Sequence, residues 1–381
     1  MKKITRKISA MLAAALLTLN LAACSSETQS DSTTQDDSQD KNGSVTIAYH
    51  GYDSGSTDNI IFGNSVRKMC ELAGVEFVAI PDMTYDADSC ISFVETQIAS
   101  GVNGLLFSPP SDSVLPTVTK LCEDAGVYWG ISTRSIEDET IRETVEASSY
   151  YVGNCYEDEY TVGETMMNYM NDFGYKKLAM ISTAKGNSAV DAREKAVVAA
   201  CEEYGMEVVV EARDFTQPSE ITAACQSFLS AYDDLDAIFI VGTYAQGATS
   251  AAVKAVQDAG RADNVKVTAV DFGLTPALVE SFNSGVLTLD VIGLQYDPFC
   301  VATKVINAVT GNPISESGFQ TELGMDYITD PETAAKWEET YSNTETTYIT
   351  EDQMKQILAQ YNEGLNADSF NELVNSWGLV K

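Results

Sequence analysis

Positive charge and histidine are scarce in this sequence of 381 residues, and both shortages exclude functions. It has 23 Lys and Arg against 56 Asp and Glu, which gives a net charge of −33. Binding to nucleic-acid phosphates or to anionic lipid headgroups needs a basic surface, so we expect neither. The chain has only 1 His, which leaves little room for histidine-ligated metal sites or acid–base chemistry. We therefore expect no metal ion and no nucleic-acid partner.

Apolar runs of membrane-spanning length, about 20 residues, are also missing. The longest run is residues 8–21, and a basic start with four Lys and Arg and no acid precedes it. This pattern is typical of a secretory signal peptide. The run ends in Leu21-Ala22-Ala23-Cys24, which resembles a bacterial lipobox. The resemblance implies cleavage after residue 23 and a lipid on Cys24. The alternative is an ordinary signal peptide that contains a cysteine.

Large apolar side chains are missing from residues 25–43. Such a segment cannot bury enough surface to fold, so we expect 24–43 to be a lipidated cysteine and a disordered tether. The mature protein is then anchored to the cell membrane by lipid, without an integral span.

From residue 44 onward, short apolar runs alternate with segments of helical periodicity. In 87–100, for example, Ile91, Val94 and Ile98 fall on one helix face. Strands that alternate with helices predict βαβ units and a mostly parallel sheet. The expected strands are 45–49, 75–80, 104–107, 127–131, 177–181, 206–212, 237–241, 265–270 and 287–292.

Similar helix endings, each an Ala-Gly pair, occur at Gly74, Gly126 and Gly260. Residues 101–126 and 234–260 match over a longer stretch, which indicates two similar α/β lobes; one large doubly wound domain is the alternative. The polar, aromatic segment around residues 150–156 marks the boundary. We expect a first lobe at 44–153 plus about 296–325, a second lobe at 154–295, and a helical C-terminal extension at 326–381.

The motifs at the strand ends resemble those of type I periplasmic-binding proteins of the ribose-binding kind, the solute-binding proteins of ABC importers. The resemblance covers about residues 44–312. It rests on the order and spacing of GVNGLLFSP with SDS at 101–113, DAIF at 236–239, and VD at 270–271 followed by TP at 275–276. It implies two Rossmann-like lobes joined by a hinge, which close on a small ligand held at the carboxyl ends of the strands.

Site residues follow from the same resemblance, position by position. The matched residues are His50, Tyr52, Asn59, Phe62, Thr133, Arg134, Arg193, Phe215, Thr243, Asp271 and Gln295. The family usually has an Asp-Arg pair where this chain has Thr133-Arg134, and often an Asn-Asp where it has Gly242-Thr243. These departures leave open a ligand other than a simple pentose or hexose.

The chemistry of these residue types suits a sugar. Planar guanidinium groups at Arg134 and Arg193 can donate to hydroxyls, and the carboxylate of Asp271 can accept from two of them. Each residue also has an alternative role. Phe62 and Phe215, the aromatics expected to stack on the ligand, could be core residues. Arg134 and His50 could be solvated, Arg193 could form a surface ion pair, and Asp271 could cap the next helix.

Seven cysteines remain besides Cys24, with no CxxC pair. An odd number means at least one free thiol, and buried small apolar residues are the default. A disulfide between Cys201 and Cys225 is conceivable.

The resemblance implies an extracytoplasmic, monomeric lipoprotein that captures a small polar ligand, a sugar above all, and delivers it to the permease subunits of an ABC importer. The alternative is a sensory receptor of the same fold, read by a kinase or chemoreceptor. We expect no enzyme activity and no cofactor, because the sequence has no GxSxG elbow, phosphate loop or HExxH motif.

Overall fold

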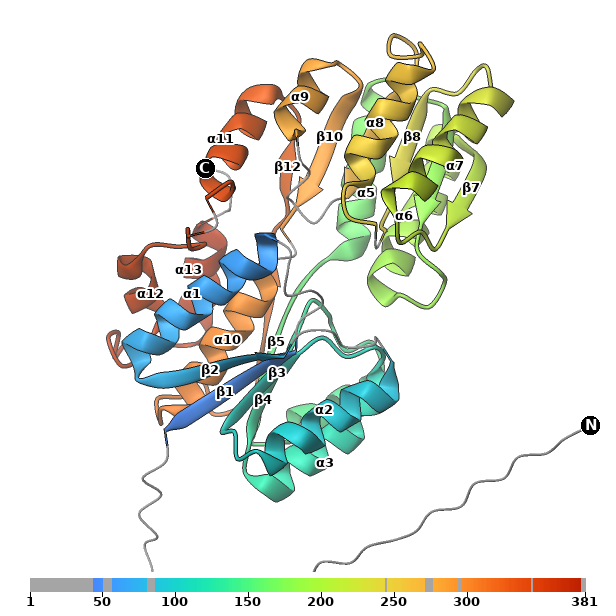
Figure 1. The fold of residues 1–381 in the computed structure, drawn as a ribbon. Coiled ribbons are helices and arrows are strands. Elements are labelled where there is room, and N and C mark those ends of the chain that lie inside the picture. The colour runs from blue at the N-terminus through green and yellow to red at the C-terminus, as the bar shows by residue number, and fades with distance from the viewer. Residues whose placement is uncertain are drawn as a thin grey trace, which may run out of the picture. The chain divides into compact units, whose positions relative to one another are not determined.

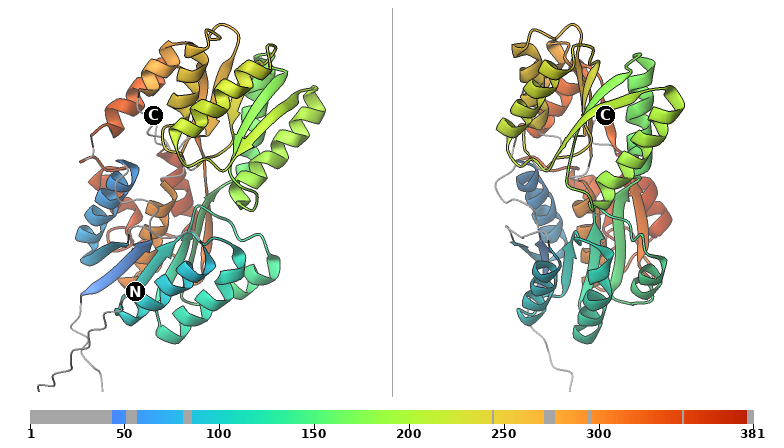
Figure 2. Two further views of the ribbon diagram at one scale, coloured as in Figure 1. Left: turned by 45° about the vertical axis from the view of Figure 1, so that its right-hand side comes forward. Right: turned by 90° about the vertical axis from the view of Figure 1, so that its right-hand side faces the viewer.

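The computed structural model describes residues 44–50, 57–80, 86–243, 245–270, 277–293, 296–343 and 345–377. They form two six-stranded sheets, each covered by helices (Figures 1 and 2). The α/β class with two mostly parallel lobes is thereby confirmed. All nine expected strands are present within one or two residues of their predicted ends.

The first lobe contains a sheet in which every pairing is parallel, in the order β11-β5-β4-β3-β1-β2. Its central strands are short and apolar because helices cover both faces. The strands are β1 (Val45–His50), β2 (Val75–Ile80), β3 (Gly104–Phe107), β4 (Tyr128–Ser132), β5 (Tyr151–Glu157) and β11 (Phe319–Leu323).

Two hydrophobic clusters lie on the two faces of this sheet. One joins the sheet to α1 (Thr57–Ala73), α10 (Tyr296–Val309), α12 (Glu351–Ile357) and α13 (Ala367–Ser376). The other joins it to α2 (Ala87–Ala99), the 3-10 turn η1 (Asp112–Val114), α3 (Leu115–Ala125) and α4 (Glu139–Glu146). Trp129 and Phe107 are fully buried and stacked in the second cluster.

The second lobe repeats this plan, with the strand order β12-β10-β9-β8-β6-β7. Only the short edge strand β12 is antiparallel to its neighbour. The strands are β6 (Lys177–Ser182), β7 (Glu207–Arg213), β8 (Ala237–Ile240), β9 (Lys266–Val270), β10 (Leu287–Ile292) and β12 (Asp326–Ile328).

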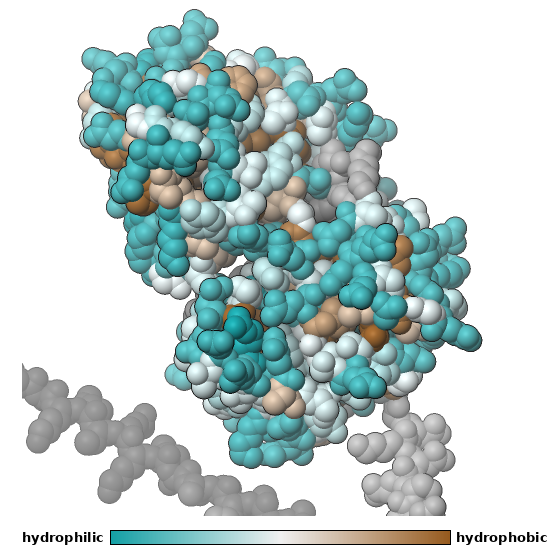
Figure 3. All heavy atoms as spheres, turned by 180° about the vertical axis from the view of Figure 1, so that it is seen from behind, coloured by the Kyte–Doolittle hydropathy of each residue, from teal (hydrophilic) through white to brown (hydrophobic). Residues whose placement is uncertain are grey.

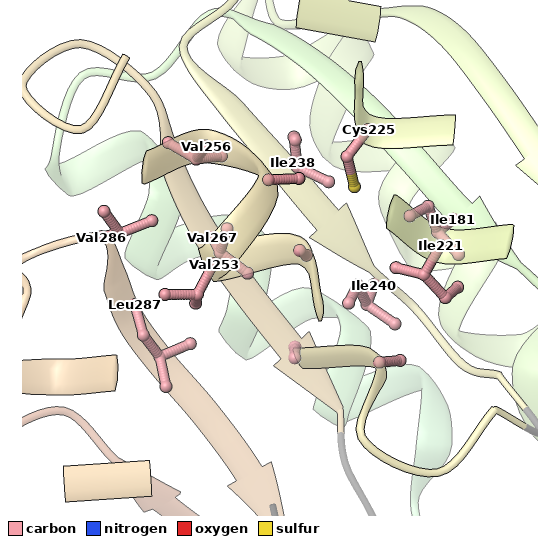
Figure 4. Close-up of a cluster of buried hydrophobic side chains, with 14 of the residues drawn as sticks. Ile181, Ile221, Cys225, Ile238, Ile240, Val253, Val256, Val267, Val286 and Leu287 are labelled. Atoms are coloured by element: carbon pink, nitrogen blue, oxygen red, sulfur yellow. The ribbon is translucent and has the colours of Figure 1, made fainter. Parts of the chain in front are cut away.

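Helices again cover both faces of the second sheet. On one face lie α5 (Glu159–Asp172) and α6 (Ser188–Tyr204). On the other lie α7 (Pro218–Ala231), α8 (Ala248–Asp258), α9 (Leu278–Asn283) and α11 (Pro331–Tyr341). Figure 4 shows the core of that face, where β8 presents Ile238 and Ile240 beneath α7 and α8.

The C-terminal segment differs from the separate helical extension that we expected from residue 326. β12 adds a strand to the second sheet, and α11 packs on α9 of the second lobe. α12 and α13 then return to the first lobe. The first lobe boundary expected at residue 153 falls inside β5, which pairs with β4 and β11 of the first sheet. Among the described residues, the chain therefore passes between the lobes four times.

The structure has regular caps at several helix ends where the sequence has Gly or Thr. Gly74, Gly126 and Gly260 take the left-handed conformation, with φ of 72°, 69° and 67°. Thr350 forms a capping box with Gln353 at the start of α12. All seven described cysteines are free thiols, and every one but Cys201 is buried, so Cys201 and Cys225 are not joined. Hydrophilic side chains dominate the face drawn in Figure 3, as the acidic composition leads one to expect.

Candidate ligand-binding site

Polar side chains gather at the carboxyl ends of the first-lobe strands. Ser108 follows β3 and Thr133 follows β4, and their hydroxyl oxygens lie 2.8 Å apart. Because Thr133 donates to the carbonyl of Ser132 at 2.7 Å, Ser108 must donate to Thr133. The carboxyl ends of parallel strands are where open α/β sheets bind ligands. This edge of the first sheet is therefore equipped with hydroxyl donors and acceptors.

Thr133 also holds a strained backbone conformation, with φ of 61°. A β-branched residue in the left-handed region is a genuine outlier, and such strain costs about 1–3 kcal/mol. Asp214, directly after β7, has φ of 65°. Two of the three non-glycine residues with positive φ among the described residues thus follow the carboxyl end of a strand, and strain of this kind concentrates at functional sites.

Arg134 connects the two lobes. Its Nη1 atom donates to the Ser188 hydroxyl, the first residue of α6, at 2.7 Å. Its own carbonyl accepts from the side-chain amide of Asn154 on β5 at 2.9 Å, which fixes the backbone at this point. The guanidinium is half-buried, so it is neither a core group nor a freely solvated one.

Glu194 on α6 is hydrogen-bonded to the carboxyl ends of two second-lobe strands. Its carboxylate accepts hydrogen bonds from Ser182 at the end of β6, from Lys185, and from both terminal nitrogens of Arg213 at the end of β7, at 2.6 and 3.2 Å. Burial alone would raise the pKa of Glu194, but hydrogen bonds from Arg213, Lys185 and Ser182 outweigh it and lower the pKa to about 2.

Arg193 is fully engaged inside the second lobe. Its Nε and Nη2 atoms donate to the carboxylate of Glu159 at 2.5 and 2.6 Å, and Nη1 donates to the carbonyl of Val241 at 2.9 Å. The side chain is 3% exposed. The ion pair weighed as its alternative role is present, but it is buried rather than on the surface.

Gly163 and Gly242 create the space around this pair. A Cβ atom at Gly163 would lie 2.6 Å from the carbonyl oxygen of Arg193, so α5 and α6 can approach only without it. A Cβ atom at Gly242 would lie 2.8 Å from Val190 Cγ2 on α6. The departure from the family pattern at Gly242 therefore has a steric reason.

The remaining expected residues divide into loop and core positions. The Thr243 hydroxyl accepts from the Ala245 amide at 3.1 Å and donates to the carbonyl of Phe215 at 3.4 Å, while Phe215 is half-buried against the core. Phe62 is 4% exposed and packs against Tyr49 and Phe77, so in this conformation it takes its alternative role as a core aromatic.

His50 lies at the end of β1 and is buried. Its ring meets Phe93 edge-on, with ring centroids 4.6 Å apart. Burial disfavours the charged imidazolium and lowers the pKa of His50 to about 4. The predicted sites at Cys24, Tyr52, Asp271 and Gln295, and the side chain of Asn59, lie outside the described residues.

Two carboxyl groups missed by the sequence analysis lie where the chain passes between the lobes. Glu157 ends β5 and Asp297 begins α10, and both are fully buried. Among the described residues, no N–H or hydroxyl donor reaches either carboxyl group, and the two groups interact with each other. Burial, followed by the charge of Glu159, raises the pKa of Glu157 to about 8.

Sequence reasoning also missed Ser108, Ser182, Ser188, Glu194 and Arg213. Ser182 and Arg213 directly follow predicted strands, which was an available signal. The hydrogen bonds that both residues make to Glu194 depend on how α6 lies over the sheet, so no local sequence pattern indicates them.

Within the part of the chain that the structure describes, no group of His, Cys, Asp and Glu suits a metal ion, and no helix is long and apolar enough to cross a membrane.

Comparison with known proteins adds the family context. Residues 47–297 match the family model described as periplasmic binding protein domain. No curated protein sequence matches this chain.

Solved structures share the fold at low sequence identity. A galactofuranose binding protein has a TM-score of 0.64 and 16% identity, over 79% of this chain and 99% of its own. An ABC transporter solute binding protein from Bacillus halodurans C-125 with bound myo-inositol has a TM-score of 0.63 and 18% identity, over 78% of this chain and 98% of its own. An ABC transporter periplasmic solute binding protein from Actinobacillus succinogenes 130z with bound D-allose has a TM-score of 0.63 and 15% identity, over 76% of this chain and 98% of its own.

Proposed function

Because the chain belongs to the periplasmic binding protein family, a family of binding proteins rather than enzymes, we propose that it captures a small polar ligand by closure of its two lobes. The hydrogen bond from Arg134 to Ser188 carries this proposal, since it joins the carboxyl end of β4 in one lobe to the start of α6 in the other. A ligand held by both groups would favour the closed state, so that binding and closure are one coupled event.

The electrostatics favour an uncharged ligand such as a sugar or polyol. Arg193 already faces Glu159, and Arg213 already faces Glu194. Neither cation therefore needs an anionic ligand to offset the cost of its burial. The hydroxyls of Ser108, Thr133 and Ser188 add groups that both donate and accept, which matches the hydroxyls of a sugar. We expect Arg134, Thr133 and Ser188 to contact the ligand, with His50, Phe215 and Thr243 around them.

We further propose that the protein is an extracytoplasmic lipoprotein that passes its ligand to an ABC importer. The basic start, the apolar run and the Leu21-Ala22-Ala23-Cys24 sequence support lipid attachment at Cys24. Cys24→Ser should release the protein from the membrane fraction into the extracytoplasmic fluid. If the variant stays with the membrane, the proposed anchor is wrong.

Ligand release tests the binding function directly. Native mass spectrometry of gently purified protein, followed by identification of any released molecule, should find a sugar or polyol. A tight ligand at 100 times Kd adds about 2.7 kcal/mol to the free energy of unfolding. A broad sugar and polyol panel should therefore raise Tm for at least one member. If no member does so and none is released, the carbohydrate proposal fails.

Arg134→Ala locates the site. The variant should fold with an unchanged Tm in the absence of ligand and should lose the ligand-induced rise. Arg142→Ala is the matched control, since Arg142 lies in α4 of the same lobe and its Nη1 atom donates to the carbonyl of Ile136 within that lobe. Unchanged affinity in Arg134→Ala would show that the site lies elsewhere.

A further inference from the structure

Asn154 is a buried asparagine of β5 whose side chain reaches the backbone of the candidate ligand-binding site. Its Nδ2 atom donates to the carbonyl of Arg134 at 2.9 Å, and the residue is 1% exposed. Arg134 in turn donates from Nη1 to the hydroxyl of Ser188 in the second lobe at 2.7 Å. A single residue, Arg134, therefore links Asn154 to the contact between the lobes.

The register of the first sheet brings Asn154 to this carbonyl. Asn154 pairs with Ile131 of β4 on one side and with Gln320 of β11 on the other, so β5 is an interior strand at this point. β4 ends one residue before Thr133, whose φ of 61° turns the chain out of the strand. Arg134 lies beyond the end of the ladder, and the side chain of Asn154 supplies a donor to its carbonyl there.

The backbone of Asn154 is itself held in place. Its carbonyl accepts from Nζ of the buried Lys304 on α10 at 2.9 Å, and the same Nζ donates to the carbonyl of Phe319 on β11 at 2.8 Å. α10 lies close to the sheet, since a Cβ atom at Gly130 would lie 2.6 Å from Val301 Cγ1 on this helix. The amide that bonds to the site is therefore supported by packing and by backbone contacts.

The loop that carries Arg134 is also held at its other end. The carboxylate of Asp112 accepts from the backbone amides of Glu137 at 2.8 Å and Asp138 at 2.9 Å. The Arg134 side chain thus starts from a fixed point of the first lobe. A long side chain loses rotamer freedom when it engages a ligand, and a fixed origin reduces that loss.

Asn154 leaves one of its own polar atoms without a partner. Its Oδ1 atom is buried and accepts no hydrogen bond from the part of the chain that the structure describes. An unpaired buried acceptor costs free energy of folding, which an apolar side chain of similar shape would avoid. The amide is therefore poorly chosen for stability alone, whereas its donor suits the carbonyl of Arg134.

We infer that Asn154 is a positioning residue for ligand binding, which holds the backbone of Arg134 at the point from which its guanidinium reaches the other lobe. The inference rests on the proposed function, because Arg134 is the residue expected to contact the ligand. Asn154 is too deeply buried to contact the ligand itself. Its loss should therefore weaken binding only through Arg134.

NMR of the full chain without ligand tests the effect on Arg134. In protein with ¹⁵N-labelled arginine, the Nε–Hε signal of Arg134 is assigned by its absence in Arg134→Lys. Relaxation should show an ordered group in the native protein and a mobile one in Asn154→Leu, which keeps a similar shape and removes the donor. Thr119→Val is the matched control, since Thr119 is a buried first-lobe residue whose side chain donates to one backbone carbonyl, at 2.8 Å. It should leave the Arg134 signal unchanged.

An Arg134 side chain that stays ordered in Asn154→Leu overturns the inference, and this result does not depend on any ligand. If Asn154→Leu does not fold, Asn154→Asp decides the question. It has the same shape, and its ionised carboxylate accepts but does not donate. We expect it to release Arg134 in the same way.

Ligand affinity tests the consequence for binding, with the sugar or polyol of the panel that raises the Tm of the native protein most. Kd should rise about 10-fold or more in Asn154→Leu and should be unchanged in Thr119→Val. If Arg134→Ala loses binding but Asn154→Leu keeps native affinity, the inference is wrong. If Arg134→Ala also keeps native affinity, the proposed binding site is wrong, which the ligand-free NMR result distinguishes from a failure at Asn154.

Discussion

The carboxyl groups of Glu157 and Asp297 interact with each other in the fully buried region where the chain passes between the lobes. The groups that face them are Glu159 of α5 and Arg193 of α6, with Cys155 nearby on β5. Burial is the largest influence and raises the pKa of both carboxyl groups. The next cause is the charge of Glu159 for Glu157 and the charge of Glu157 for Asp297, whereas the interaction with Asp297 lowers the pKa of Glu157.

This pair predicts a loss of stability as pH rises. A carboxyl group with a raised pKa keeps its proton in the folded state, whereas the unfolded chain releases it above its usual pKa of 4.5. The free energy of unfolding should therefore fall between pH 4.5 and about 8, by up to about 1.4 kcal/mol per pH unit for each proton. Urea unfolding at pH 5, 6, 7 and 8 measures this slope, and Glu157→Gln should flatten it. Exposed Glu202→Gln is the control; equal slopes in Glu157→Gln and native protein contradict the prediction.

Burial of His50 predicts that the protein loses stability as the pH becomes acidic. Its pKa is lowered to about 4 by burial, so the unfolded chain takes up a proton near pH 6.5 that the folded protein does not. Stability from this group is present above pH 6.5 and is lost as pH falls toward 4. Because the chain has 1 His, a tag-free sample gives one imidazole signal by NMR. That signal should titrate near 4 when folded and near 6.5 in urea. A folded midpoint near 6.5 would contradict burial of the ring.

Glu194 and Glu211 offer a matched pair of substitutions. Both accept from Arg213, but Glu194 is 6% exposed and Glu211 is 53% exposed. Glu194→Gln leaves Arg213 and Lys185 without their buried partner and should cost about 2–3 kcal/mol, somewhat less than a fully buried pair. Glu211→Gln should cost less than about 1 kcal/mol. Urea denaturation of both variants provides the comparison, and similar losses would refute a central role for Glu194.

A side chain at position 242 should clash with Val190, and a smaller residue at position 190 should relieve the clash. A Cβ atom there would lie 2.8 Å from Val190 Cγ2, so Gly242→Ala should destabilise the protein by about 1–3 kcal/mol. Val190→Ala removes the methyl groups that interfere. The double variant should therefore be more stable than the sum of the two single changes allows, which a double-mutant cycle from urea unfolding measures. Strict additivity would mean that the two sites do not touch.

The strands of both lobes were predictable because they are short, apolar runs buried on both faces. β11 and β12 were not predictable, since both are edge strands, and exposed polar residues such as Gln320 and Glu322 interrupt the apolar pattern of β11. β5 was expected as a lobe boundary, because its polar and aromatic residues hid a strand that pairs on both sides.

The positions of the candidate site residues were predictable only where the end of a strand determines them. Thr133 and Arg134 follow a buried strand, and the structure places them at its carboxyl end. The partners of Arg193 and Glu194 depend on how α5, α6 and the sheet pack together, at separations of 34 residues for Glu159 and 19 for Arg213. Phe62 packs against Tyr49 and Phe77, a contact that could not be predicted because a motif match does not tell which face of α1 turns toward the core.

Four connections between two bodies also restrict how those bodies can move. Two bodies on a single tether can bend and twist freely, whereas several parallel tethers resist torsion and leave one easy bending axis. The segment from β11 to α12 supplies the third and fourth connections, and Ser65 of α1 accepts from the Tyr348 amide at 2.9 Å within the last of them. The segment from β11 to α12 would thus restrict the proposed closure to bending about one axis.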